Sequence, residues 1–101
     1  MKRTKTIQKE IAKAIDNFAS KSDKMMGYEP NSKYSIVKSL LYWFHDDKSI
    51  AVDGMLYDIL VYGCSDFGYG KELDTKINKL VHDAGYYLEY AGQGVYNIVE
   101  G

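Results

Sequence analysis

The fold is decided by residues 71–84, KELDTKINKLVHDA, and by the segment that follows them. Apolar residues recur here at positions 73, 77, 80, 81 and 84, the spacing of one face of an amphipathic helix. Gly85 then occupies the position where helices commonly end. Two runs rich in aromatic and β-branched residues, 86–90 and 95–99, flank the turn Ala91-Gly-Gln-Gly94. The chain is therefore predicted to pass from a helix into a β-hairpin.

Three further elements are predicted upstream. Asn31 or Ser32 can cap a helix that runs to Phe44, with an apolar stripe at positions 36, 37, 40, 41 and 44. Residues 50–52 predict a short strand. Asp53 can cap a third helix, with apolar residues at 55, 56, 59 and 60, and Gly63 ends it. From Tyr34 onward the order is helix, short strand, helix, loop, helix and hairpin, which is that of a winged helix-turn-helix domain.

The residues themselves resemble one family of such domains. Lys71 to Leu80, followed by Gly92-Gln-Gly-Val-Tyr96, is similar to the recognition helix and wing of the output domain of OmpR-type response regulators. Ser49 to Gly63 is similar to the family's short strand and positioning helix. The resemblance covers about two-thirds of the chain, and no receiver domain precedes the module. It implies a DNA-binding domain whose recognition helix carries Lys71, Lys76 and Lys79 toward DNA.

The first 33 residues predict a separate element. Between Thr4 and Ser20, apolar residues at 7, 11, 14, 15 and 18 form one face of an amphipathic helix, and a connector follows at 21–33. We therefore expect a basic helix and connector at 1–33, and a module with a three-helix core and a hairpin wing at 34–101. The apolar face of the N-terminal helix either docks onto this module or joins two copies in a homodimer.

Charge is divided unevenly along the chain. The net charge is −1, but residues 1–33 contain eight basic and four acidic residues, whereas residues 34–101 contain five basic and ten acidic residues. No Lys or Arg follows Leu80, so the predicted wing cannot neutralise phosphates, which supply most non-specific DNA affinity. A basic N-terminal arm of Lys2, Arg3 and Lys5 is expected to supply that charge instead.

The predicted DNA contacts follow from the helical stripe. With Leu73, Ile77 and Leu80 turned inward, polar side chains project outward and can bond bases or phosphates. The predicted set is Lys71, Thr75, Lys76, Asn78, Lys79 and His82 of the helix, Gln93 of the hairpin turn, and Lys2, Arg3 and Lys5 of the arm. The leading prediction is a transcriptional regulator that binds double-stranded DNA.

A protein-binding function is the alternative prediction. Four of the ten tyrosines, Tyr86, Tyr87, Tyr90 and Tyr96, cluster in the acidic hairpin. Alternation places Tyr86 and Tyr90 on one face and Tyr87 on the other. Exposed tyrosine is typical of protein contacts, so the alternative is a winged-helix module that inhibits or modulates a nucleic-acid enzyme such as a polymerase through this hairpin. Small stand-alone chains of this kind resemble phage or mobile-element products.

Other classes of function are not indicated. The single cysteine, Cys64, cannot form an intramolecular disulfide and is expected to be a small buried residue in a reduced, cytoplasmic protein. The sequence contains no signal peptide and no run of about 18 apolar residues. Without a spaced Cys/His set or a nucleophile–base pair, we predict no metal site, no cofactor and no enzymatic activity. Gly68-Tyr-Gly-Lys71 lacks the spacing of a phosphate-binding loop.

Overall fold

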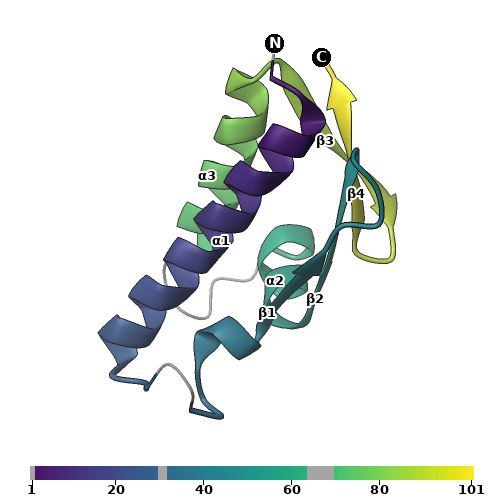
Figure 1. Ribbon diagram of the computed structural model, residues 1–101. Helices are drawn as coiled ribbons and strands as arrows, with labels where there is room; N and C mark the ends of the chain where they lie inside the picture. The colour runs from purple at the N-terminus through teal and green to yellow at the C-terminus, as the bar shows by residue number, and fades with distance from the viewer. Residues whose placement is uncertain (1, 30–31, 64–69) are drawn as a thin grey trace.

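The computed structural model describes residues 2–29, 32–63 and 70–101. In order along the chain, these residues form α1 (Thr4–Met26), the 3-10 helix η1 (Ile36–Lys38), β1 (Leu40–Trp43), β2 (Ser49–Asp53), α2 (Gly54–Val61), α3 (Gly70–Asp83), β3 (Tyr86–Gly92) and β4 (Val95–Glu100). The strands form one antiparallel sheet in the order β1-β2-β4-β3 (Figure 1). The predicted α+β class and the C-terminal hairpin are confirmed.

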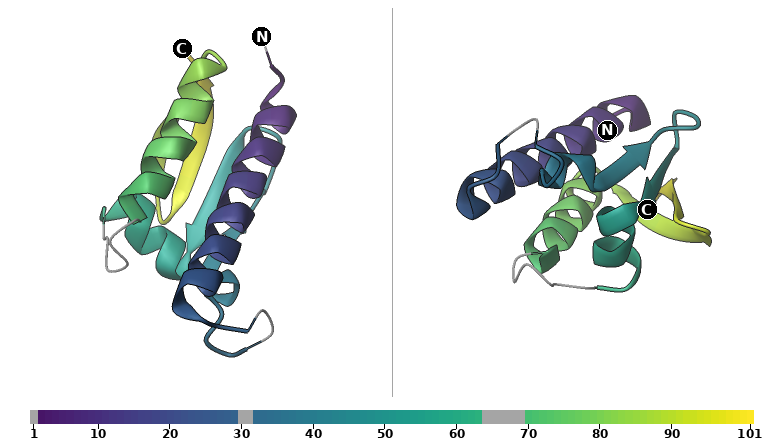
Figure 2. Two further views of the ribbon diagram at one scale, coloured as in Figure 1. Left: turned by 90° about the vertical axis from the view of Figure 1, so that its left-hand side faces the viewer. Right: turned by 90° about the horizontal axis from the view of Figure 1, so that it is seen from below.

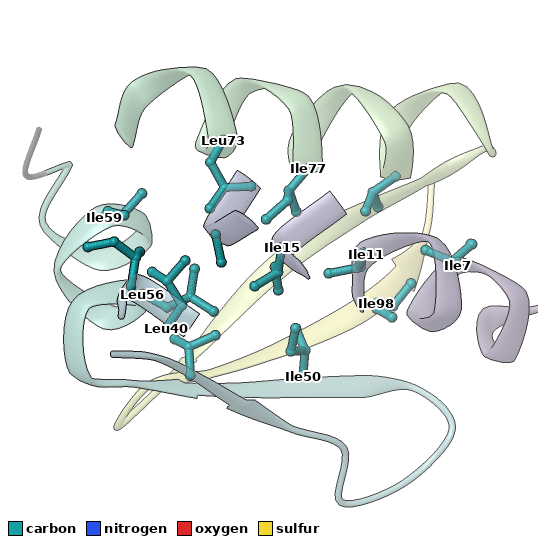
Figure 3. Packing of buried hydrophobic residues seen from close by; sticks show 14 residues of the cluster. Ile7, Ile11, Ile15, Leu40, Ile50, Leu56, Ile59, Leu73, Ile77 and Ile98 are labelled. Atoms are coloured by element: carbon teal, nitrogen blue, oxygen red, sulfur yellow. The ribbon is translucent and has the colours of Figure 1, made fainter. Parts of the chain in front are cut away.

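The helices cover one face of the sheet. Figure 2 shows α1 and α3 side by side, with the strands behind them. The core lies between these layers (Figure 3), and each helix contributes to it. Its members are Ile7, Ile11, Ile15 and Ala19 of α1, Leu56 and Ile59 of α2, Leu73, Ile77 and Val81 of α3, and Ile36, Leu40, Ile50, Val52 and Ile98. Of the two alternatives for the apolar face of α1, docking onto its own chain is the one observed.

Helix α1 is longer than predicted, because its buried face continues past Ser20. Ala19 and Ser22 are buried, and so is the carboxylate of Asp23, which accepts a hydrogen bond from Ser35 Oγ at 2.6 Å. The helix ends at Gly27, which adopts the left-handed conformation (φ 73°) that favours glycine. Residues 21–26 therefore belong to the helix, not to the connector.

The helix predicted from Asn31 or Ser32 to Phe44 is wrong. Apolar residues are so dense between 36 and 44 that they fit a helical period and an alternating one equally well. In the structure Leu40 is buried and Leu41 is exposed, and Leu41 and Trp43 pair with Asp53 and Ala51 of β2. The side chain of Ser32 accepts a hydrogen bond from the Tyr34 amide in a turn, and Asn31 lies outside the described residues.

Most of the other predicted boundaries are confirmed. The strand at 50–52 is present as β2, and Asp53 Oδ1 accepts a hydrogen bond from the Gly54 amide at the start of α2. Gly85, at φ 90°, follows α3, and its amide donates to His82 O at 3.0 Å. The hairpin turn consists of Gln93 and Gly94, both with positive φ as a two-residue hairpin loop requires. Cys64 and most of the predicted loop at 65–70 lie outside the described residues.

Candidate nucleic-acid interface

The outward face of α3 is formed by the residues predicted for it. The helix buries Leu73, Ile77 and Val81 against the core, so the positions between them face away from it. The six side chains predicted for DNA contact on this helix are all exposed: Lys71, Thr75, Lys76, Asn78, Lys79 and His82. The face therefore offers hydrogen-bonding and cationic groups along the helix.

Five of these six side chains line two grooves, one on each side of α3, and Lys71 lines neither of them. A groove of about 640 Å³ between α3 and β3 is lined by Thr75, Asn78, Lys79 and His82, together with Asp74, Tyr87 and Leu88. A second groove, of about 410 Å³, lies between α1 and α3. It is lined by Lys2, Glu10, Lys13, Ala14, Asn17, Lys76, Leu80, Asp83 and Ala84. Lys76 thus faces α1, and Lys79 faces the hairpin.

Polar groups in the groove beside β3 are largely bonded to their own helix. Lys79 Nζ lies 2.7 Å from Asp83 Oδ2, and this contact raises the pKa of Lys79 and lowers that of Asp83. The Asn78 amide donates to Asp74 O at 2.9 Å and to Asp74 Oδ1 at 2.8 Å. Burial raises the pKa of Asp74. An Asn78 amide engaged in this way must first release Asp74 before it can read a base.

The groove beside α1 brings the N-terminus and α3 together. Lys2 Nζ pairs with Glu10 Oε1 at 2.7 Å, and the Tyr86 hydroxyl donates to the Lys2 carbonyl at 2.9 Å. The second carboxylate oxygen of Glu10 is shielded from solvent and has no hydrogen-bond partner. Lys13 and Lys76 take part in none of the ion pairs within 4 Å among the described residues. Lys13 is not among the residues predicted from the sequence to contact DNA.

Of the predicted N-terminal arm, Lys2, Arg3 and Lys5, only Lys2 lies in the groove between α1 and α3. Lys2 lines the groove next to Lys76. Arg3 is the residue before α1; its side chain makes no capping hydrogen bond, although its carbonyl accepts from the amides of Thr6 and Ile7. Lys5 is exposed on α1, and Gln93 is exposed at the hairpin turn. Arg3, Lys5 and Gln93 line neither of the two grooves.

The four predicted tyrosines do not form one surface. Tyr86 and Tyr90 lie on the face of β3 that also carries Leu88, and pair with Glu100 and Tyr96 of β4. The rings of Tyr90 and Tyr96 are 4.9 Å apart, and burial raises the pKa of Tyr96 to about 12. Tyr87 lies on the opposite face and is 45% exposed. Of the four, only Tyr87 is therefore on the face of the sheet opposite the core, and because β3 is the edge strand Tyr87 also lines the groove beside α3.

That open face holds apolar residues that sequence reasoning missed. Leu41 and Trp43 of β1 are each 44% exposed, and Trp43 shares its face with its cross-strand neighbour Ala51. Trp43 Nε1 donates to His45 Nε2 at 2.9 Å. These positions were missed because they were assigned to a helix, in which neighbouring residues do not alternate between two faces.

Comparisons with protein-family models, with curated proteins and with solved structures found no match. In the described part of the chain, no three His, Cys, Asp or Glu side chains converge in a way that could hold a metal ion. No helix in the described ranges is both long enough and apolar enough to span a membrane. The arrangement of the chain's own residues is therefore the basis for a functional assignment.

Proposed function

We propose that this chain is a small DNA-binding protein of the winged helix-turn-helix type that regulates transcription. The order of elements supports the assignment, with α1 as the first of the three core helices in place of the helix predicted near residue 36. Helices α2 and α3 follow as the helix-turn-helix pair, and β3 and β4 form the wing. The short strand before α2 pairs with the second strand of the wing, β2 with β4.

One observation carries the proposal: a 14-residue amphipathic helix, α3, presents an unbroken polar face at the surface. The major groove of B-DNA, about 12 Å wide, admits one α-helix. Lys71, Lys76 and Lys79 can contact phosphates or guanine, whereas Asn78 can pair with adenine once it leaves Asp74. In this arrangement α3 enters the groove and the packed helices behind it hold its orientation.

Binding to random-sequence duplex DNA across a salt series tests the proposal. We expect measurable binding at about 50 mM salt, and a steep fall as salt rises, because phosphate contacts release counterions. Replacing both Lys76 and Lys79 by alanine is expected to abolish binding while the circular dichroism spectrum is unchanged. A complete lack of binding by the wild-type protein at that salt concentration contradicts the proposal.

A protein-binding module is the second candidate function, and the open face of the sheet favours it. Exposed aromatic and aliphatic residues on a face that no helix covers, Leu41, Trp43 and Tyr87, are typical of protein contacts. A partner such as a polymerase would then bind the sheet and not α3. The double variant Leu41→Ser with Trp43→Ala is expected to lose such a partner and to keep DNA binding, whereas the lysine variants would do the opposite.

A further inference from the structure

Charge on the two sides of α3 is not equivalent. On the side of β3, Lys79 is paired with Asp83, and Asp74 lies in the same groove. The hairpin beyond adds Glu89 and Glu100 and contains no Lys or Arg. A DNA backbone placed across the hairpin would therefore meet carboxylates and no unpaired cation among the described residues there.

The α1 side carries the opposite balance. Two of the carboxylates in and beside its groove, Glu10 and Asp83, have a lysine at 2.7 Å, and Glu72 has one at 3.9 Å. Lys13 and Lys76 remain, one on each helix, and both line the same groove. Lys5 and Lys9 precede Lys13 at intervals of four residues, so the three lie on one face of α1 about 6 Å apart along its axis.

We propose that the phosphate backbone of the bound duplex lies along the groove between α1 and α3, held between Lys13 and Lys76. This inference rests on the proposed DNA-binding function and adds to it the side of α3 on which the backbone lies. The duplex is displaced away from the wing, because Lys13 and Lys76, which can neutralise its phosphates, both line the groove on the α1 side of α3. The hairpin then braces α3 and makes no phosphate contact.

The shape of the groove agrees with this assignment. Its apolar lining consists of Ala14, Leu80 and Ala84, and the two alanines leave room between the helices. Asn17 adds an amide that can donate to a phosphate oxygen. Two acidic residues line the groove and oppose binding: Asp83, which is paired with Lys79, and Glu10, whose carboxylate occupies Lys2. Removing that carboxylate should therefore strengthen binding.

Two matched pairs of variants of the full chain test the inference, with random-sequence duplex DNA as the probe. Lys13→Gln is expected to reduce affinity about five- to ten-fold at about 0.1 M salt and to reduce the salt slope by about one, as loss of one phosphate contact does. Lys48→Gln, in the exposed turn between β1 and β2, removes the same charge away from the groove and is expected to change affinity less than two-fold. Glu10→Gln is expected to increase affinity several-fold, whereas Glu89→Gln on the wing should leave it unchanged.

The outcomes separate the two proposals. If the wild-type protein binds duplex DNA and Lys13→Gln keeps both its affinity and its salt slope, the backbone lies elsewhere and the inference is wrong although the function stands. An increase in affinity with Glu89→Gln equal to that with Glu10→Gln would place the DNA across the wing and overturn the inference in the same way. Failure of the wild-type protein to bind DNA removes the proposed function and the inference together.

Discussion

Asp23 joins the end of α1 to the segment that leads into the sheet. Its carboxylate is buried and accepts hydrogen bonds from Ser35 Oγ at 2.6 Å and from the Ile36 amide at 2.5 Å. Ser35 is itself fully buried, so no solvent can replace the carboxylate. This contact accounts for two departures from the predicted structure: α1 continues to residue 26, and residues 36–38 form a tight turn.

Replacing Asp23 by alanine should be strongly destabilising. The change leaves a buried hydroxyl and a buried amide without a partner, which we expect to lower the free energy of unfolding by about 2–4 kcal/mol. Asp47→Ala, at an exposed position between β1 and β2, is the control and should change it by less than about 0.5 kcal/mol. Urea unfolding measures both, and equal stabilities of the two variants would show that the Asp23 contacts contribute little.

Gln8 plays a similar role at the other end of α1. It is buried, and its amide donates to Asp46 O at 2.6 Å and to Ser49 O at 2.8 Å. In the sequence it is only a polar residue that interrupts an apolar run. Such a role depends on a turn about 40 residues away, so it cannot be predicted from neighbours in the chain.

Among the elements, the hairpin contains two glycines with positive φ, Gly92 and Gly94. A side chain at Gly94 would also clash with a neighbouring strand, whereas one at Gly92 would not. Gly94 has φ 78°, and a Cβ atom there would lie 2.5 Å from the carbonyl oxygen of Val52 in β2. Gly92 has φ 94°, but a Cβ atom there would meet nothing within 4 Å. Substitution of Gly92 therefore tests backbone strain alone, whereas substitution of Gly94 adds a steric clash to that strain.

Gly94→Ala should be considerably more destabilising than Gly92→Ala. In both variants the left-handed conformation of alanine lowers the free energy of unfolding by about 1–2 kcal/mol. Only Gly94→Ala also forces β4 away from β2 and weakens the hydrogen bond from the Val52 amide to Gly94 O, now 2.8 Å. We expect a further loss of about 2 kcal/mol from this displacement. Thermal unfolding of both variants measures the difference, and equal losses would mean that the sheet accommodates the methyl group.

The elements that could be predicted are those with one clear period. α3 has apolar residues on a single face, and the two strands of the hairpin flank a turn that contains glycine. Both elements could therefore be located from the sequence. Residues 36–44 contain Tyr42, Trp43 and Phe44 in succession and fit both periods. Their state was decided by pairing with β2, in which Tyr42 opposes Val52. For residues 40–43, pairing with β2 therefore determines the secondary structure, and local propensity does not.

At the scale of the whole molecule, the candidate interface was only half predictable. Exposure of Lys76 and Lys79 follows from the stripe on α3 alone. Their separation into two grooves, and the position of Lys13 opposite Lys76, depend on how α1 packs beside α3. The open face of Leu41 and Trp43 depends likewise on all three helices lying on one side of the sheet. These features are determined by tertiary packing. The periodicity of apolar residues along the chain gives no information about that packing.

The same packing predicts that α1 and the sheet unfold together. Ile11 of α1 is fully buried in the core with residues of α3 and the sheet. Ile11→Ala should therefore lower the free energy of unfolding by about 2–5 kcal/mol. Trp43, the one tryptophan, reports on β1 by fluorescence, and circular dichroism reports on the helices. Both transitions should shift to lower urea by the same amount, whereas Lys9→Ala on the exposed face of α1 should shift neither. A helical signal that shifts while the Trp43 transition stays in place would show that residues 1–33 and 34–101 fold as separate units, and that the groove between α1 and α3 is not a rigid surface for DNA.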